Sequence, residues 1–315
     1  MLKKNKIPLL IIGVAIAING FGQQTPQYSQ YLFNNYLINP AIGGSGDYLE
    51  VKLGSRTQWL GFGAAPTTYL ISAHSPVNFG HNEPRKFGDR DHHAMGGYVL
   101  KDETGPISNL NFYGSYSYHM RLSYQLRVSF GFFAGIKQYS LNTDGLTTAT
   151  PDDPDLLSIS AITPDAAAGL WMYTKKYFGG LSIQQLLPIP LGGTSNTLRM
   201  HYFLTGGYRI RLRKIDSYII PSTHIKFGLL TPIQADINIK FNYQNTMWAG
   251  LAYRKVDALI GIVGFNVRNF FQVGYAFDLT MSKLRHYSSN THEIIITFRY
   301  KPRKRIEDLR CPDFG

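Results

Sequence analysis

Residues Thr291–Tyr300, THEIIITFRY, alternate apolar and polar side chains with a period of two. One face of such a strand carries aliphatic and aromatic groups: Ile294, Ile296, Phe298 and Tyr300. The other face carries polar and charged groups: Glu293, Thr297 and Arg299. A strand with one apolar and one polar face suits a position between lipid and water.

The same alternation recurs along most of the chain. The clearest repeat is Ala235–Tyr243, ADINIKFNY, and others occupy Gln125–Lys137, Arg199–Arg213 and Phe271–Thr280. Between Glu50 and Lys301 there are about fourteen segments long enough to cross an outer membrane as tilted strands. The sequence therefore predicts an all-β fold, a transmembrane antiparallel up-and-down β-barrel of about fourteen strands, with both termini periplasmic.

The first 22 residues are typical of a secretory signal peptide. Lys3, Lys4 and Lys6 form a basic start, Leu9–Ile18 is apolar, and small residues precede Gln23. A retained inner-membrane anchor is the alternative, but the apolar run is short for a spanning helix. We expect four parts: a signal peptide at 1–22, a periplasmic or lumenal segment at 23–49, the outer-membrane barrel at 50–301, and a periplasmic tail at 302–315.

Composition agrees with a barrel without requiring one. The mean hydropathy is −0.15, as expected where only alternate residues meet lipid. Aromatic residues make up 14%, charged residues 17%, and there are 31 glycines. A pair of soluble β domains stays open on composition alone. The net charge of +12 raises nucleic-acid binding as an option, but an exported chain without a nucleic-acid motif argues against it. Cys311 is the only cysteine, so no intramolecular disulfide can form.

Connections and charges suggest an orientation. Short links at 122–124, 175–176, 214–217, 244–245 and 267–268 alternate with longer ones such as 139–163, 187–197 and 281–290. Short periplasmic turns and long outer loops are usual in bacterial barrels. The segment Val77–Asp91 breaks this rule, because it is long and falls on the periplasmic side. The predicted outer loops carry acidic residues: Asp102, Glu103, Asp144, Asp152, Asp153 and Asp155.

The predicted periplasmic ends are basic. Arg209, Arg211, Arg213 and Lys214 are the densest group, and we identify them as candidate residues for binding an acidic partner. The alternative is that these side chains reach lipid phosphates on that side of the membrane.

No catalytic or metal-binding constellation stands out. Asp152, Asp153 and Asp155 match no calcium-loop spacing, and His92 and His93 would point to opposite faces of a strand. His74, His119, His201 and His224 are scattered, and we expect them in the lumen or at a rim. There is no nucleophile elbow and no phosphate-binding loop. We therefore expect no enzyme activity, no cofactor and no small-molecule substrate, with a barrel lipid hydrolase as a remote alternative.

Several motifs resemble one known family. These are Gln27–Gly44 (QYSQYLFNNYLINPAIGG), 56–59 (RTQW), Gly63–Thr68 (GAAPTT), Gly105-Pro106, 116–119 (YSYH) and the last strand from Thr291. In order along the chain they are similar to the PorP/SprF family of outer-membrane proteins, which is associated with type IX secretion and gliding motility.

The resemblance implies a role and partners. It implies an outer-membrane protein that works with type IX secretion components and supports export or surface anchoring of a secreted adhesin with a type B C-terminal domain. Outer-membrane lipid is the other expected partner, and nucleic acid is not one. A general diffusion pore is the alternative, because a barrel of about fourteen strands leaves a lumen unless something fills it. The segment Gln23–Gly46 is long enough to do so.

Three local expectations complete the sequence reading. The last strand should pair with the first near Val51–Trp59, because closure removes both sheet edges. Asn39-Pro40 should fix the turn into the first strand, since the residue before proline is restricted. Trp59 should sit near a membrane interface.

Overall fold

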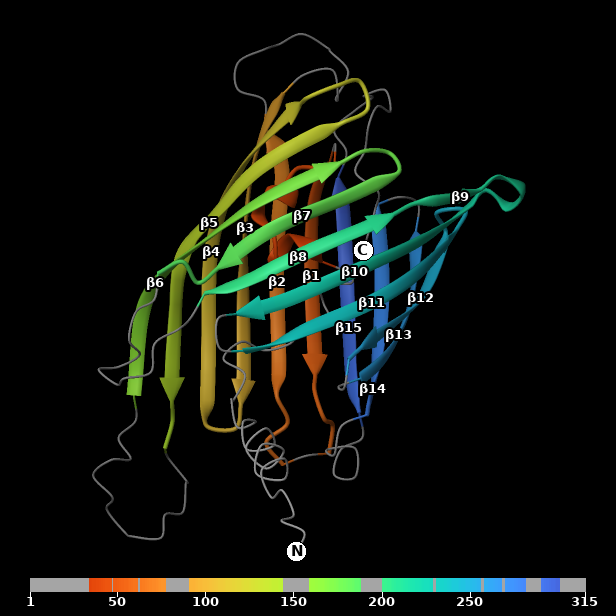
Figure 1. Ribbon diagram of the computed structural model, residues 1–315. Coiled ribbons are helices and arrows are strands. Elements are labelled where there is room, and N and C mark those ends of the chain that lie inside the picture. Colours follow the sequence, from red (N-terminus) through yellow and green to blue (C-terminus); the bar gives the residue numbers. More distant parts are fainter. Residues whose placement is uncertain are drawn as a thin grey trace, which may run out of the picture.

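The protein is described by a computed structural model in which residues 34–46, 48–61, 63–77, 91–143, 159–187, 200–228, 231–255, 258–267, 270–281 and 290–300 are placed. These residues form one closed antiparallel sheet with a short internal segment (Figure 1). No helix among them is both long enough and apolar enough to cross a membrane.

The strands follow one another around the barrel in chain order. They are β1 (Leu49–Thr57), β2 (Thr67–Val77), β3 (His92–Thr104), β4 (Ile107–Arg121), β5 (Arg127–Leu141), β6 (Ile159–Tyr173), β7 (Tyr177–Gln184), β8 (His201–Tyr208), β9 (Ile210–Leu212), β10 (Ser217–Gly228), β11 (Thr231–Tyr243), β12 (Met247–Arg254), β13 (Ala258–Val267), β14 (Phe271–Thr280) and β15 (Thr291–Tyr300). Each pairs with its neighbours in sequence, except that β8 and β9 both pair with β10, and this is the up-and-down arrangement predicted.

The barrel is closed by its first and last strands. β1 pairs with β15 from Leu49 opposite Tyr300 to Thr57 opposite His292, as predicted. Strands β8 and β9 both pair with β10 in one register, because Gly207 faces Ser222 and Leu212 faces Ser217. They are thus one wall strand interrupted at Arg209, and the described residues form a barrel of 14 strands.

The two faces of the wall sort as the alternation predicts. On β15 the side chains of Ile294, Phe298 and Tyr300 are exposed on the outside, whereas Glu293 and Thr297 are buried. β11 shows the same division, with exposed apolar groups at Ile237, Ile239 and Tyr243 and buried polar groups at Asp236, Asn238, Lys240 and Asn242. The exposed belt is apolar and the enclosed face is mostly polar, as an outer-membrane barrel requires.

The two rims of the barrel differ. We call the rim at which β1 begins and β15 ends the turn rim, and the opposite one the loop rim. The predicted short links all fall on the turn rim, between β4 and β5, β6 and β7, β9 and β10, β11 and β12, and β13 and β14. Val77 and His92, the ends of the long connection that breaks the rule, also lie at the turn rim. That the turn rim is periplasmic stays a prediction.

The loop rim has short connections as well as the longer ones predicted. β3 and β4 are joined directly by Gly105 and Pro106, which is possible because Gly105 adopts a φ of +55°. The connections after β10 and β12 are also short, and β5 and β6 extend further than predicted, pairing as far as Leu141 and Ile159.

The prediction of an acidic outer surface is wrong for Asp102. Asp102 belongs to β3, is buried inside the barrel, and accepts a hydrogen bond from the Thr68 hydroxyl at 2.6 Å. A lumen-facing position in a strand thus replaces the expected loop position. Asp144, Asp152, Asp153 and Asp155 lie outside the described residues, as do residues 1–22 and 302–315.

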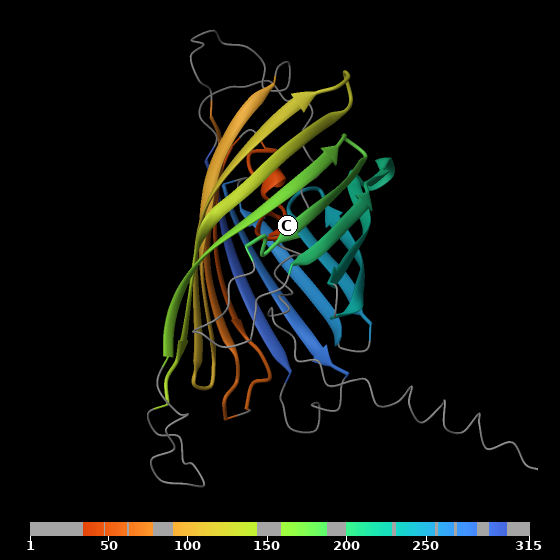
Figure 2. The same ribbon diagram turned by 60° about the vertical axis from the view of Figure 1, so that its left-hand side comes forward.

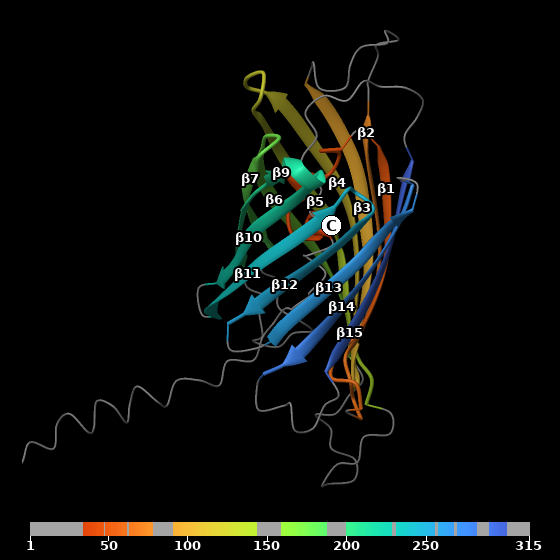
Figure 3. The same ribbon diagram turned by 90° about the vertical axis from the view of Figure 1, so that its right-hand side faces the viewer.

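A short segment occupies the interior. Residues 34–46, which we call the plug, contain two 3-10 helices, η2 (Asn35–Leu37) and η3 (Pro40–Ile42). Figures 2 and 3 show this red segment enclosed by the strands from two further directions. Every plug residue from Asn34 to Gly46 is buried or half-buried.

Candidate functional site

The plug has a compact local structure that its sequence explains. Pro40 occupies the first position of η3, where its missing N–H costs nothing. The Asn39 side chain caps the same helix by accepting a hydrogen bond from the Ala41 N–H at 3.0 Å. The sequence interpretation placed Asn39-Pro40 at the turn into the first strand. The structure places it deeper, in the middle of the plug.

Asn39 also joins two wall strands. Its Nδ2 donates to the Leu170 carbonyl of β6 at 3.0 Å and to the Leu181 carbonyl of β7 at 3.1 Å. With the cap to Ala41, its amide group makes three hydrogen bonds while the residue is 3% exposed. One side chain therefore both shapes the plug and fastens it to the wall.

Wall side chains satisfy the carbonyl groups of the plug. The Gln184 Nε2 donates to Leu37 O at 2.9 Å, and the Ser182 hydroxyl donates to Ile38 O at 2.8 Å. The Ser129 hydroxyl donates to Ala41 O at 2.6 Å. A buried carbonyl left unpaired would cost about 1–3 kcal/mol, so these contacts specify how the plug sits.

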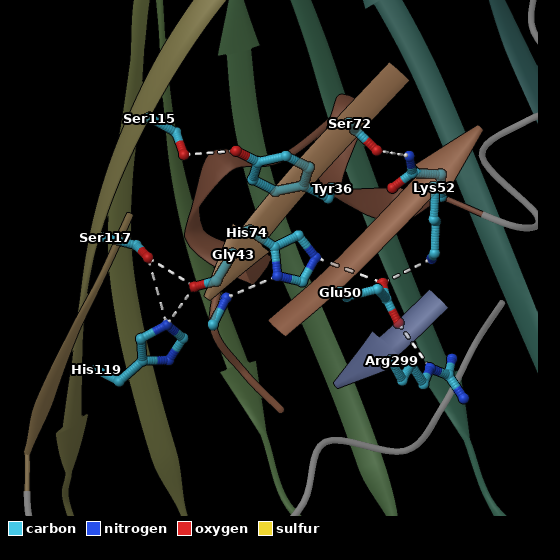
Figure 4. Close-up of polar contacts among 12 residues, drawn as sticks. Tyr36, Gly43, Glu50, Lys52, Ser72, His74, Ser115, Ser117, His119 and Arg299 are labelled. Carbon is cyan, nitrogen blue, oxygen red and sulfur yellow. Dashed lines mark hydrogen bonds and ion pairs between the residues drawn. The ribbon is translucent and has the colours of Figure 1, made fainter. Parts of the chain in front are cut away.

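A glycine pair forms the second half of the plug. The Gly43 carbonyl accepts a hydrogen bond from the Ser117 hydroxyl at 2.7 Å and lies 2.7 Å from His119 Nε2 (Figure 4). The Gly44 carbonyl lies 3.0 Å from His92 Nε2. Because a carbonyl only accepts, both histidines must carry their proton on Nε2. Gly44 has a φ of +76°, and a Cβ there would meet the Ala94 side chain at 2.1 Å, so only glycine fits.

The N-terminal end of the plug is held by two of its own side chains, those of Asn34 and Tyr36. The Asn34 amide donates to the Ser72 hydroxyl of β2 at 2.8 Å. The Tyr36 hydroxyl lies 2.5 Å from the Ser115 hydroxyl of β4, and its ring contacts Phe133 edge-on at a centroid distance of 5.2 Å. Burial raises the pKa of the Tyr36 hydroxyl, so this group stays protonated and available as a donor.

The plug is linked to the seam where the barrel closes. The Gly44 N–H donates to Nδ1 of His74 at 3.2 Å, and Nε2 of His74 lies 3.4 Å from a Glu50 carboxylate oxygen (Figure 4). Glu50 on β1 also pairs with Lys52 and with Arg299 on β15, each at 2.9 Å. Arg299 and Glu50 thus tie the last strand to the first beside the plug.

The plug also reaches the opposite wall. Ile38 packs against a buried apolar cluster on β12–β15 that comprises Trp248, Ala252, Ala258, Ile260, Ile262, Ala276 and Ile295. Among the described residues, the hydrogen bonds that join the plug to the wall are made to strands β2–β7. The plug is thus fastened by hydrogen bonds on one side of the barrel and makes apolar contact on the other. Together these contacts bridge the lumen.

The predicted partner-binding residues lie elsewhere, at the turn rim. The Arg209 guanidinium lies 3.6 Å from the centre of the Tyr218 ring, and Arg211 pairs with Asp216 at 3.1 Å. Arg213 and Lys214 are exposed in the 3-10 turn η4 (Arg213–Ile215). The four residues are therefore close together in one hairpin, with Arg209 partly occupied by its ring contact.

The scattered histidines of the sequence come together in part. His74 and His119 lie in the lumen as predicted, and with His92 they surround the Gly43–Gly44 turn. His93 faces outward, where it contacts the Tyr116 hydroxyl at 2.6 Å. Trp59 lies in the connection after β1, where its backbone N–H donates to Thr291 Oγ1 at 3.3 Å. The sequence indicated that Gln23–Gly46 is long enough to fill the lumen, and its described part, residues 34–46, lies there. The wall serines that bind it follow no recognisable spacing.

Within the placed parts of the chain, no group of three or more His, Cys, Asp and Glu side chains is arranged to hold a metal ion. The site consists mainly of wall side chains that donate hydrogen bonds to the carbonyl groups of the plug, with wall acceptors at His74, Leu170 and Leu181. Its chemistry is recognition of a polypeptide segment inside the barrel.

Comparisons with known proteins agree with this architecture. A family model described as "Type IX secretion system membrane protein PorP/SprF" matches residues 20–298. No curated protein matches the sequence. Among solved structures, the toluene transporter TbuX of Ralstonia pickettii is similar, with a TM-score of 0.54 and 11% identity over 92% of this chain and 98% of that one.

Two more solved structures show the same fold. A deltaS2S3 mutant of the monoaromatic hydrocarbon channel TodX gives a TM-score of 0.53 at 10% identity, over 85% of this chain and 94% of that one. A FadL homologue of Pseudomonas aeruginosa gives 0.52 at 9% identity, over 89% and 95%. At such identities the likeness establishes the outer-membrane barrel fold alone.

Proposed function

Because the chain belongs to the PorP/SprF family of type IX secretion system membrane proteins, we propose that it is a dedicated partner barrel of that system. In the outer membrane it supports the export, the surface anchoring, or both, of a secreted adhesin with a type B C-terminal domain, and through this adhesin it contributes to gliding motility. The family match over 20–298 is the observation that carries this proposal.

The plug supports a partner role over a diffusion pore. A general pore needs a continuous aqueous path, whereas here residues 34–46 bridge the lumen and their carbonyl groups are paired with wall donors such as Ser129 and Ser182. The hydrocarbon channels have the same fold, but their sequences are only 10% and 11% identical to this chain. The likeness therefore does not extend their transport activity to this chain. The pore remains the alternative that a conductance measurement decides.

An enzymatic role has little support. The family is one of secretion membrane proteins, and several of the buried polar side chains on β2–β7 bind the plug. A barrel lipid hydrolase would release fatty acids from phospholipid vesicles that contain the purified protein, and we expect no such release.

The direct test is deletion of the gene. We expect the deletion strain to lose one large surface protein, measured by quantitative mass spectrometry of the cell surface and the medium, and to glide less. Other type IX cargo should stay at wild-type levels, and the intact gene on a plasmid should restore the missing protein. Unchanged surface and medium proteins would overturn the proposal. Loss of all type IX cargo would also contradict a dedicated role.

A further inference from the structure

One sheet edge at the turn rim has no partner strand. The last residue pair between β7 and β8 is Tyr177 with Tyr208, and just beyond it the Arg209 N–H donates to the Lys176 carbonyl at 2.6 Å. There the β6–β7 turn ends the β7 side of the sheet. In the placed residues, β9 pairs only with β10. Figure 1 shows the β9 hairpin projecting past the β6–β7 turn.

The register identifies which peptide groups are free to bind. In an antiparallel strand, alternate residues direct their N–H and C=O to opposite neighbours. Since Arg209 directs its N–H toward the β7 side, Arg211 does so as well. The Arg211 peptide groups therefore face away from β10, at a level that β7 does not reach.

This edge is open to solvent. The side chains of Arg211 and Asp216 are 60% and 67% exposed, and Arg213 and Lys214 of the adjoining turn are exposed as well. A free strand edge is a template for another strand, and proteins usually cover or shorten it. Here it is short and marked by charge.

The charge around the edge is strongly one-sided. Arg211, Arg213 and Lys214 belong to the hairpin, and exposed Lys175 and Lys176 lie in the β6–β7 turn just before β7 begins. Asp216 is the acidic residue of the hairpin. Such a surface repels basic segments and favours acidic ones.

We propose that the β9 edge is a docking site for an extended acidic segment of a partner protein. The segment adds as a strand that continues the line of β7 beyond Lys176 at the turn rim. It hydrogen-bonds the Arg211 peptide, and its carboxylates face Arg213, Lys214 and Lys175. Strand addition of this kind combines main-chain affinity with side-chain selectivity. That the partner belongs to the secretion machinery or its cargo rests on the proposed function; the chemistry of the docking site does not.

A pair of variants separates the strand edge from the charge. Arg211→Ala removes the guanidinium but keeps the peptide N–H. Arg211→Pro removes both, and proline is tolerated where the N–H of an edge strand faces away from the ladder. Both variants lose the ion pair with Asp216 equally, so their difference reports the N–H. Heat-modifiable mobility in gels shows that each barrel is folded.

The binding test uses the purified full chain in detergent with two short synthetic peptides, one alternating Glu and Thr and the other alternating Lys and Thr. We expect the Glu peptide to slow hydrogen exchange of the Arg211 amide by about tenfold or more, as pairing with a strand does. It should bind Arg211→Ala more weakly and Arg211→Pro not at all. No slowing with the Glu peptide overturns the proposal. So does equal binding of the Lys peptide, or equal binding to both variants, which would indicate charge attraction alone.

A test in cells keeps the two proposals apart. In the deletion strain, we expect the Arg211→Ala gene to restore more of the missing surface protein than the Arg211→Pro gene. If deletion changes no surface protein, the proposed function fails, and the peptide measurement still decides the docking site. If deletion removes the protein but Arg211→Pro restores it fully, the docking site fails and the proposed function stands.

Discussion

Nε2 of His119 lies 2.7 Å from the carbonyl oxygen of Gly43, which joins strand β4 to the plug. The Ser117 hydroxyl donates to the same oxygen, so two neighbouring lumenal positions of one strand converge on one peptide group. Similar contacts recur at Ile38 and Ala41. The wall is thus specific for the backbone of this segment, and changes at the contact surface should release it without unfolding the barrel.

Gly131 tests how closely the plug fits. A Cβ at this position would lie 2.5 Å from the Ala41 nitrogen and 2.6 Å from the Pro40 carbonyl carbon, so Gly131→Ala must displace the plug. We expect a cysteine placed at Ala41, in a Cys311→Ser background, to react with a maleimide at least about tenfold faster, because local opening exposes it.

The matched control for this change is Gly261→Ala. A Cβ at Gly261 meets nothing within 4 Å, and on β13 this residue shares the outer face with exposed Leu259 and Val263. Its labelling rate should equal that of the wild type. Equal rates in both alanine variants would show that the plug does not depend on this close approach.

Asn39→Ala should loosen the plug by removing its capping and wall hydrogen bonds together. Each buried partner left unsatisfied costs about 1–3 kcal/mol, so the docked state should become less populated while the strands stay paired. The maleimide labelling at position 41 measures this. Asn238→Ala is the control, since Asn238 is also buried but bonds the Ser222 hydroxyl at 3.0 Å within the wall. If Asn39→Ala is labelled no faster than Asn238→Ala, the anchoring role of Asn39 is contradicted.

The fold was largely predictable from the sequence, and so was the presence of a segment long enough to fill the lumen, but the contacts that hold the plug were not. The alternation in Thr291–Tyr300 and Ala235–Tyr243 depends only on which face meets lipid, so strand faces, strand number and closure followed from it. Asp102 was misplaced because an acidic residue near a turn looks the same whether it faces solvent or a polar lumen. The plug contacts of Ser129, Ser182 and Gln184 depend on the barrel register, which brings together residues that are far apart in sequence.

Glu50 should be important for closing the barrel. Glu50→Ala removes the ion pair with buried Lys52 at 2.9 Å and the ion pair with Arg299 on β15. Losing one member of a buried pair costs about 3–5 kcal/mol, which urea unfolding in lipid vesicles measures. The exposed pair of Glu103 with Lys101 provides the control, because Glu103→Ala should cost less than about 1 kcal/mol. Similar costs for the two variants would contradict the proposed role of the Glu50 cluster.

Ile294→Arg tests the lipid-facing assignment of β15. The Ile294 side chain is 51% exposed on the outer face, and an arginine at mid-depth on that face costs about 2–4 kcal/mol. Folding yield into vesicles and urea unfolding should both fall accordingly, whereas Ile294→Leu should behave as the wild type. An arginine tolerated at no cost would place this face in water.

The central claim is that the plug closes the lumen, so that the barrel acts as a protein partner and not as a pore. The ionic conductance of the purified wild-type protein in planar lipid bilayers tests this most directly. We predict no steady conductance for the wild type and frequent openings for Gly131→Ala, with Gly261→Ala remaining closed. A steady ohmic conductance of the wild type, unchanged in both variants, would contradict the claim and identify the barrel as a diffusion pore.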